Sequence, residues 1–248
     1  MSQWRIGVDV GGSGVKSGVV DVETGELIGE RLREDTPVPS TPDAVAAAIR
    51  VLVDQLDAPG PIGVGFPAVV RRGWVSTASN IDSSWIGVNA VEVFEPVVGR
   101  EIRMLNDADA AGLAEVHFGS AKGTSGKVLM LTFGTGIGSA LIIDGRLVPN
   151  IEAGQMELNS VRPAEIEYSA KARRAENLTW DEWGARARDY VTLAQQVFTP
   201  DLIVIGGGVS KHWEDYKEFL TFAQVPTVPA ALGNNAGIVG AAYYSVTV

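Results

Sequence analysis

Two segments of the chain repeat one design, and this repeat constrains the fold more than any other feature. In residues 6–20 and 128–143 an apolar run meets a cluster of Gly, Ser and Thr, and a second apolar run follows. This order predicts a strand, a tight turn and a second strand. Because glycine accepts positive φ and lacks a Cβ, successive N–H groups in such a turn can point at phosphate oxygens.

The two turns carry hydroxyl side chains at matching places, Ser13 in the first and Thr135 in the second. A single glycine turn is best explained as an ordinary β-hairpin. Two copies instead predict two similar halves, each presenting a hairpin that can hold phosphate. We therefore expect a phosphorylated ligand in a cleft between the halves.

Composition excludes several classes of protein. With 248 residues, 46% of them hydrophobic, the chain can form one large or two small domains. A net charge of -10 argues against nucleic-acid or anionic-membrane partners, so a polyanionic ligand needs a local basic patch. The chain has no cysteine, no leader-like segment and no apolar run of the ~20 residues that span a bilayer. We expect a cytoplasmic protein.

The first half predicts strands followed by a helix and a further strand. Residues 6–10, 15–20 and 27–32 form a meander, and a helix begins at Pro42 with Thr41 as its N-cap. A buried strand follows near residues 61–68. The loop 77–82 then mixes Asn and Asp between two tryptophans, which suits a sugar, although a surface loop with an Asx turn explains it as well.

A strand at residues 102–105 leads directly into Asn106 and Asp107 at the start of an Ala-rich helix. This places both side chains at a strand end, where α/β proteins bind ligands. The carboxylate could accept a proton from a hydroxyl group that the neighbouring amide orients. The alternative is that Asp107 or Asp109 only caps the helix.

The second half repeats the plan with an inserted helical region. Residues 164–174 have helix character, and Thr179 with Glu182 forms a capping box that predicts a helix over 180–198. Basic residues gather between Arg162 and Arg188, a pattern that usually marks a solvated helix face. A buried strand at 201–205 ends in three glycines, and residues 232–242 predict a small-residue helix that packs tightly.

Six motifs in this order resemble the sugar kinases of the ROK family, and the resemblance covers nearly the whole chain. Residues 105–112, 180–183 and 234–240 resemble the actinobacterial glucokinases of that family that use polyphosphate or ATP. The six motifs are Asp9-x-Gly11-Gly12-x-x-x-Lys16, Asn106-Asp107, Gly134 to Gly138, Glu152-x-Gly154, Gly206 to Gly208 and Asn234-Asn235-Ala236-Gly237.

The resemblance implies an α/β, actin-like ATPase (ribonuclease H-like) fold of two similar domains with a cleft between them. The small N-terminal domain would be residues 1–107, completed by a C-terminal helix at about 235–248, and the larger domain would be residues 108–234. The resemblance also implies a homodimer. Residues 159–167 look atypical for the polyphosphate branch.

The implied reaction is phosphorylation of glucose, with mannose as a second sugar, by ATP or inorganic polyphosphate with Mg²⁺ and without zinc. Asp107 would be the general base, and Asp9 would hold Mg²⁺ through water. Sugar ligands would be Asn80, Asn106, Asp107, Glu152, Gln155 and Glu157. Phosphate or nucleotide ligands would be Asp9, Gly11, Gly12, Ser13, Lys16, Thr135, Gly136, Gly207, Gly208 and Asn234.

The chain departs from the family at Gln155, where the family pattern Glu-x-Gly-His has histidine. Glutamine still donates and accepts hydrogen bonds but carries no proton near neutral pH. We therefore expect sugar affinity or preference to differ while the catalytic carboxylate is unaffected. For Lys16 two roles stay open, a contact to phosphate or a solvated position on the second strand.

Other functions remain open at this stage. One is an ATP-only kinase for another hexose or an amino sugar. A transcriptional regulator would need a helix-turn-helix before the first strand, for which we expect no room, and an actin-like filament or chaperone would not need Asn106, Asp107 or Glu152. If polyphosphate is the donor, we expect a groove lined by some of the following cations: Lys16, Lys122, Lys127 and the basic residues from Arg162 to Arg188.

Overall fold

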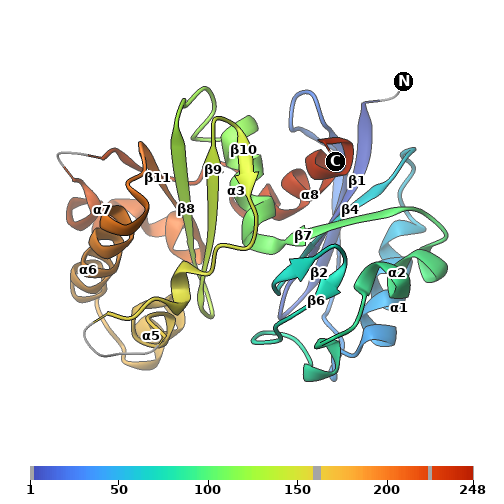
Figure 1. The fold of residues 1–248 in the computed structure, drawn as a ribbon, viewed down its shortest axis with the longest axis horizontal. Coiled ribbons are helices and arrows are strands. Elements are labelled where there is room, and N and C mark those ends of the chain that lie inside the picture. The colour runs from blue at the N-terminus through green and yellow to red at the C-terminus, as the bar shows by residue number, and fades with distance from the viewer. Residues whose placement is uncertain (1–2, 159–162, 223–224, 248) are drawn as a thin grey trace. The chain divides into compact units, whose positions relative to one another are not determined.

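The computed structural model describes residues 3–158, 163–222 and 225–247, which form two compact α/β units (Figure 1). Unit 1 consists of Met1–Ala114 and Asn235–Val248, and unit 2 consists of Glu115–Asn234. The boundary that we predict between residues 107 and 108 lies at the start of the helix α3 (Asp107–His117). As a division into functional domains it stays a prediction.

Unit 1 is built on a five-stranded sheet in the order β3-β2-β1-β4-β7. The meander β1-β2-β3 is antiparallel, whereas β1, β4 and β7 run parallel to one another. The strands are β1 (Trp4–Val10), β2 (Val15–Asp21), β3 (Leu27–Glu34), β4 (Ile62–Phe66) and β7 (Ile102–Asn106), with a small hairpin of β5 (Val70–Arg71) and β6 (Trp74–Val75). The helices are α1 (Pro42–Val53), α2 (Ala90–Val98), the first part of α3, α8 (Ala236–Thr247) and the short η1 (Ser83–Trp85).

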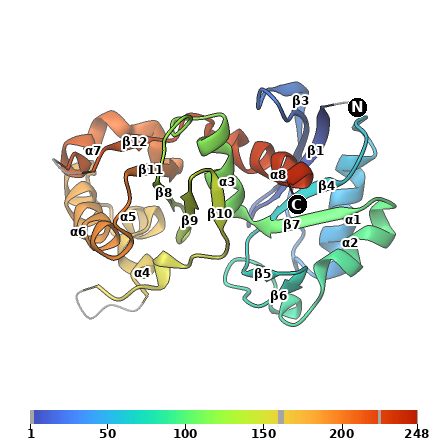
Figure 2. The same cartoon turned by 45° about the horizontal axis from the view of Figure 1, so that its top comes forward.

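Alternation along β1 and β4 gives the two faces of this sheet opposite character. On one face Ile6, Val8 and Val10 are fully buried in a core that includes Val45 and Ile49 of α1. The other face carries glycines. Helix α8 covers this face, and Figure 2 shows α8 beside β1 and β4. The period of two in a strand therefore separates a face of large side chains from a face of bare backbone.

Helix α8 approaches this second face almost backbone to backbone. A Cβ on Gly7 would lie 2.0 Å from the carbonyl oxygen of Ile238, and one on Gly63 would lie 1.7 Å from that of Ala241. Gly240 of α8 is equally close to the carbonyl oxygen of Ala110 in α3. The tight packing predicted for the small-residue helix is therefore confirmed, with its helical part beginning at Ala236.

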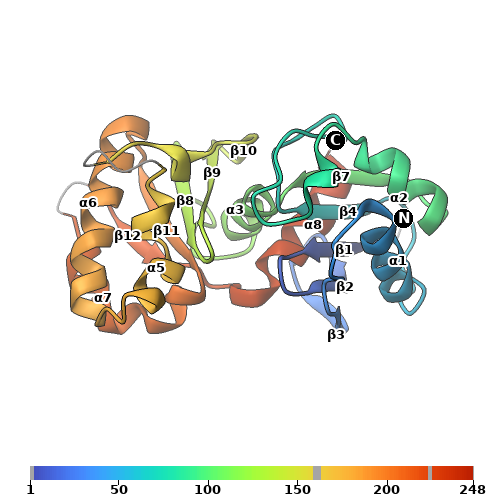
Figure 3. The same cartoon turned by 90° about the horizontal axis from the view of Figure 1, so that it is seen from below.

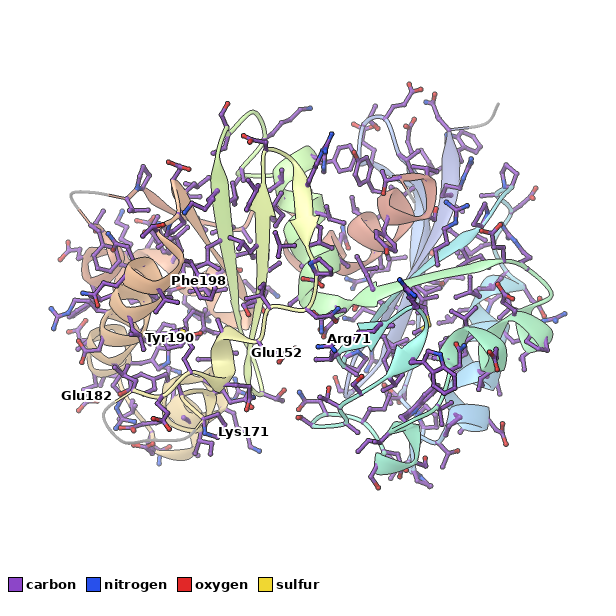
Figure 4. The ribbon with its side chains drawn as sticks, in the orientation of Figure 1. Arg71, Glu152, Lys171, Glu182, Tyr190 and Phe198 are labelled. Atoms are coloured by element: carbon purple, nitrogen blue, oxygen red, sulfur yellow. The ribbon has the colours of Figure 1, made fainter. Side chains whose placement is uncertain are left out.

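Unit 2 has a five-stranded sheet in the order β10-β9-β8-β11-β12, with helices α5, α6 and α7 gathered on one side (Figure 3). Figure 4 labels three residues along α6, from the exposed Glu182 past the fully buried Tyr190 to Phe198 at its end. The strands are β8 (Lys127–Phe133), β9 (Ile137–Ile143), β10 (Arg146–Val148), β11 (Leu202–Gly207) and β12 (Thr227–Pro229). The helices are α4 (Glu165–Tyr168), α5 (Ala170–Ala175), α6 (Trp180–Phe198), α7 (Trp213–Leu220), η2 (Ala153–Gln155) and η3 (Gly208–His212), and η4 (Gly233–Asn235) ends the unit.

The two sheets have the same strand order and the same directions. In each, three antiparallel strands are followed by two parallel ones, and the first hairpin of each sheet carries the glycine turn. The duplication inferred from the repeated hairpins is therefore present in the whole of both sheets.

The structure confirms some local sequence signals and differs from others. The capping box of Thr179 and Glu182 is present, and α6 spans the predicted residues. Thr41 occupies the N-cap position of α1 but its hydroxyl makes no capping hydrogen bond. The helical stretch at 164–174 is two short helices, because the hydroxyl of Ser169 accepts from Ala172 N and starts α5 anew.

Candidate active site

The first glycine turn, residues 11–14, is closed by a hydrogen bond from Gly11 N to Gly14 O at 3.0 Å. Two side chains from the third strand and the segment after it hold the turn in place. Arg33 Nη2 donates to Ser13 O at 3.0 Å, and Thr36 Oγ1 donates to Gly11 O at 2.5 Å. Gly12 and Ser13 are exposed. Sequence reasoning missed Arg33 and Thr36, since neither lies in a motif.

Asp9, the predicted magnesium ligand, lies opposite Lys16 in the β1-β2 register. Lys16 Nζ donates to Asp9 Oδ2 at 3.0 Å, so the lysine is an ion-pair partner of Asp9. Its contact with phosphate stays a prediction. On its other side Asp9 meets the start of α8, because a Cβ on Gly237 would lie 2.7 Å from Asp9 Cγ. A helix N-terminus is a favourable place for a carboxylate.

The surroundings of Asp9 fit a magnesium ion of the kind found with phosphate substrates. Mg²⁺ in such sites is held by one or two carboxylates together with phosphate oxygens and water. Among the described residues no group of three acidic or histidine side chains could enclose a metal ion. A single partly buried carboxylate beside the first glycine turn supplies what this type of site requires from the protein.

Asn106 and Asp107 lie where β7 ends and α3 begins. Asn106, 8% exposed, accepts from Ala108 N at 2.9 Å and Asp109 N at 3.1 Å and donates to Ala68 O at 3.1 Å. Asn106 therefore caps α3 through two N–H groups, and Asp107 shares one of these donors, so the predicted capping role is not limited to Asn106. Asp107 is half-buried, and its Oδ1 accepts from Ala108 N at 2.8 Å.

The parallel strands bring these groups to one edge of the sheet in unit 1. Asp9 on β1 pairs with Gly65 on β4, and Phe66, the next residue, pairs with Asn106 on β7. Asp9 and Asn106 therefore lie at the same carboxyl edge, two strands apart, as expected for a ligand site in an α/β sheet. Asn80 lies in the exposed loop nearby, where its carbonyl oxygen would be 3.4 Å from a Cβ on Gly12.

The acidic residue of that loop, Asp82, has a structural role. Asp82 Oδ1 accepts from Ser84 N at 2.9 Å and starts η1. The hydrogen bonds from Ser84 hold the pKa of Asp82 below its ordinary value. At this position the Asx turn is confirmed, and a sugar contact of the loop stays a prediction.

The second glycine turn belongs to unit 2 and is closed by Gly134 N donating to Gly136 O at 2.9 Å. Thr135 at its tip is exposed. Gly207 pairs with Phe133 at the end of β8, so Gly207 and Gly208 lie at the same sheet edge as the turn. Gly207 has φ +82°, and a Cβ there would lie 2.3 Å from Phe133 O, so this position requires glycine.

Glu165 joins the second turn to the segment that carries the predicted sugar ligands. Its Oε2 accepts from Ile137 N at 3.2 Å and its Oε1 accepts from Gln155 Nε2 at 2.8 Å. A Cβ on Gly136 would lie 2.1 Å from Oε2. The residue in the place of the family histidine is thus held by a carboxylate. Sequence reasoning missed Glu165 because it lies in the stretch that looked atypical for the family.

Glu152 precedes η2, and Figure 4 shows it in the segment that follows β10. Reduced hydration and, second, the charge of Glu165 raise the pKa of Glu152 above its ordinary value. The segment is fixed by Ser139, whose Oγ accepts from Ala153 N at 2.9 Å and donates to Ile151 O at 2.5 Å. Glu157 and Asn234 lie on exposed segments of the same unit.

The basic residues proposed for a polyphosphate groove differ in what they contact. Arg173 stacks on the ring of Trp180, with Cζ 3.6 Å from the ring centroid. Arg186 forms hydrogen bonds of 2.6 and 3.0 Å with Glu176. Lys127 Nζ is bound at the end of α6 by Phe198 O and Thr199 Oγ1. Arg162 lies outside the described residues.

Two basic side chains of α5, Lys171 and Arg174, are exposed. Lys171 N donates to Gly134 O at 3.0 Å, so the first residues of α5 touch the turn directly, and Figure 4 labels this lysine. The helix that carries these two exposed cations therefore contacts the second turn through its backbone, in a protein whose net charge is -10.

Comparison with known proteins assigns the family. Residues 5–156, more than half of the chain, match the ROK family. The chain belongs to the ROK family. A polyphosphate glucokinase of Mycobacterium tuberculosis (strain CDC 1551 / Oshkosh) is 45% identical over 241 residues, which cover 97% of this chain and 90% of the relative.

Solved structures agree with this assignment. An inorganic polyphosphate/ATP-glucomannokinase from Arthrobacter sp. strain KM has a TM-score of 0.92 and 43% identity, with 98% of each chain covered. A ROK family glucokinase from Streptomyces griseus, in complex with glucose and AMPPNP, has a TM-score of 0.81 and 26% identity, with 96% of this chain and 98% of that chain covered. The predicted actin-like α/β fold is therefore confirmed, while the cleft between its halves stays a prediction.

No helix in the described part of the chain combines the length and the apolarity that crossing a bilayer requires.

Proposed function

We propose that this ROK family member transfers a phosphoryl group from inorganic polyphosphate or ATP to the 6-hydroxyl of glucose. The observation that carries the proposal is the end of β7, where Asn106 provides the helix cap and Asp107 follows it at the carboxyl edge of the sheet. Two glycine turns and a relative at 45% identity, named polyphosphate glucokinase, support the same reaction.

Asp107 acts as the general base in this proposal. Its carboxylate accepts the proton of the sugar 6-hydroxyl while the oxygen attacks the terminal phosphorus of the donor. The amide of Asn106 holds the strand end by donating to Ala68 O at 3.1 Å and accepting two N–H groups of α3, which fixes the direction of Asp107.

The main task of such a site is to stabilise the negative charge on the transferred phosphoryl group, and backbone N–H groups can donate hydrogen bonds to it. We assign phosphate binding to the turn with Gly11, Gly12 and Ser13 and to the turn with Thr135 and Gly136. Gly207, Gly208 and Asn234 would bind the donor further from the reacting phosphorus. Mg²⁺, held by Asp9 through water, would neutralise donor phosphate charge when bound, and Lys16 would orient Asp9.

Polyphosphate would continue from the second turn along α5. The support is the contact from Lys171 N to Gly134 O together with the exposed cations Lys171 and Arg174. A short row of cations beside a phosphate-binding turn can attract a polyanion to an otherwise acidic protein. ATP would use the same turn without needing the outer cations.

The sugar would be bound by Asn80, Asn106, Glu152, Gln155 and Glu157. Gln155 would act as a fixed hydrogen-bond donor or acceptor, because Glu165 holds its amide at 2.8 Å. Glucose is the proposed sugar and mannose a second one, since the similar Arthrobacter protein is named a glucomannokinase. We further propose that the protein works in the cytoplasm as a homodimer, without zinc, nucleic acid or membrane.

The test replaces Asp107 with Asn. Asparagine keeps the Oδ1 that accepts from Ala108 N, so we expect a stability loss below about 1 kcal/mol but a fall in kcat of roughly 10²- to 10⁴-fold with either donor. Asp43→Asn is the matched control, because Asp43 lies in the first turn of α1 and is exposed. Coupled assays of glucose 6-phosphate formation with ATP and with polyphosphate measure the rates.

A wild-type rate in Asp107→Asn would rule out this general base. No phosphorylation of any hexose or amino sugar by the wild-type chain, with either donor, would rule out the kinase and favour an actin-like binding or regulatory protein. Activity with ATP alone, on another hexose or an amino sugar, would favour the alternative enzyme, an ATP-only kinase for that sugar.

A further inference from the structure

Glu115 is a fully buried carboxylate that the proposed reaction does not use. It lies on α3, eight residues after Asp107, and has 0% exposure. A buried carboxylate is tolerated only where hydrogen-bond donors replace its lost hydration. The donors around Glu115 therefore show what this residue holds together.

Four uncharged groups donate to this carboxylate. Three donate to Oε2, namely Ser120 N at 2.8 Å, Ser120 Oγ at 3.1 Å and Ala231 N at 3.0 Å. The fourth, Leu232 N, donates to Oε1 at 2.8 Å. Hydrogen bonds to an ionised carboxylate are about twice as strong as those between neutral groups. Two of the four donors come from a segment more than a hundred residues further along the chain.

The chain leaves space for the carboxylate at Gly119. A Cβ on this glycine would lie 2.0 Å from Glu115 Oε2 and 2.7 Å from its Cδ. The N–H groups of Gly119 and Ala121 both donate to Glu115 O, at 3.1 Å each, so the backbone also wraps around this residue. The pocket is therefore shaped for a carboxylate at this position.

The positions of these contacts along the chain indicate their structural role. The chain passes between its two compact units twice, at Ala114/Glu115 and at Asn234/Asn235. Glu115 is the first residue after the first crossing, and it binds Ala231 and Leu232 just before the second. We propose that Glu115 is a positioning residue that fastens the two connecting segments to each other on the side of unit 2.

The catalytic consequence rests on the proposed kinase function. In an enzyme whose units must move relative to each other during turnover, the connecting segments determine which backbone angles can change. With Glu115 in place, Ala231 and Leu232 remain part of unit 2, so rotation is confined to residues beyond them, where Gly233 has φ +53°. Without it, the flexible link would become longer.

The first test is hydrogen–deuterium exchange of the full-length chain with Glu115→Gln. A glutamine side chain offers one oxygen and presents an NH₂ group to backbone donors, so at least one hydrogen bond to the connecting segment is lost. We expect the amides of Ala231 and Leu232 to exchange at least about tenfold faster, while amides of the central strands β8 and β11 keep their rates.

A second variant leaves Glu115 itself unchanged. Gly119→Ala places a methyl group in the space of Glu115 Oε2, so it should speed exchange at Ala231 and Leu232 in the same way even if Glu115→Gln folds poorly. Asp201→Asn is the matched control, because Asp201 Oδ2 accepts from a backbone N–H of Lys127 at 2.7 Å, away from the connecting segments. It should leave Ala231 and Leu232 unchanged.

Steady-state kinetics test the catalytic part. We expect both kcat and the KM for glucose to change in Glu115→Gln and Gly119→Ala, and neither to change in Asp201→Asn. Unchanged exchange at Ala231 and Leu232, or equal acceleration throughout unit 2, would overturn the fastening role. Faster local exchange with unchanged kinetics would overturn the positioning role. Exchange does not depend on activity, so a failure of the proposed kinase function would be recognised separately.

Discussion

The glycine face of the unit 1 sheet gives the most demanding prediction, the effect of Gly63→Ala. In the native structure the space for this Cβ is occupied by the backbone of α8. The new atom would lie 1.7 Å from Ala241 O, 2.3 Å from Ala241 C and 3.0 Å from Ala242 N. All three are main-chain atoms, so no side-chain rotation can relieve the contact.

The size of the effect follows from these distances. Ordinary contact begins at 3.4 Å, so α8 must move by nearly 2 Å or β4 must bend. Ala241 and Ala242 are fully buried, as are their neighbours Ile238 and Val239 to within 1%. Overpacking of a dense core costs about 1–3 kcal/mol, and a clash between two backbones belongs at the upper end, so we expect a loss of about 3 kcal/mol.

Gly18→Ala on β2 is the matched control. A Cβ there would lie 2.6 Å from Leu27 Cδ2, the end of a flexible and partly exposed side chain that can turn away. We expect a loss below about 1 kcal/mol for this variant. Urea unfolding of both variants and of wild type, followed by tryptophan fluorescence, measures the difference in free energy of unfolding.

Activity gives a second readout of Gly63→Ala. Gly237 at the start of α8 lies against Asp9, so displacement of the helix should also lower the kinase activity of the folded fraction. If both alanine variants lose the same free energy, or if Gly63→Ala is as stable as wild type, close packing of α8 on the sheet backbone does not determine its position.

Three further changes test other parts of the molecule. Glu152→Gln should flatten the dependence of stability on pH. The folded pKa of Glu152 is raised above the ordinary value of 4.5, so wild type loses stability as pH rises from that value through the folded pKa, whereas glutamine has no proton to lose. Urea unfolding at several pH values measures this difference. Arg174→Glu should raise the KM for polyphosphate more than the KM for ATP, whereas Lys217→Glu on α7 should affect neither; equal effects of Arg174→Glu on both donors would remove α5 from the proposed path. Thr179→Ala removes the capping box of α6 and should lower the free energy of unfolding by about 1 kcal/mol in thermal denaturation, and an unchanged midpoint would contradict the cap.

Sequence signals that act within a few residues were the dependable ones. Thr179 and Glu182 identify the start of α6 because both partners of the capping box lie within one helical turn. The glycine turns identify both hairpins for the same reason. Thr41 occupies the predicted N-cap position, but its hydroxyl makes no capping hydrogen bond. The helix can still begin there, because Pro42 favours the first helical position without help from that hydroxyl.

The parts that sequence could not predict depend on partners far apart in the chain. Asn106 was expected to hold the sugar and was found to cap α3 as well, which depends on where β7 ends. Glu165 reaches Gln155 and Ile137 only after the strand pair and α4 have formed. Glu115 looks like one polar residue on an Ala-rich helix until Ala231 and Leu232 are brought to it by the fold.

The two faces of the unit 1 sheet should differ in how much sequence redesign they tolerate. Residues such as Ile6 and Val8 pack through side chains, whose volumes a protein engineer can exchange with those of α1 while the total is kept. On the other face Gly7 and Gly63 meet α8 through main-chain atoms, which no choice of side chain can adjust. The position of α8 beside Asp9 should therefore persist through extensive repacking of the hydrophobic core, and a stabilised variant could be built from that side without disturbing the reaction.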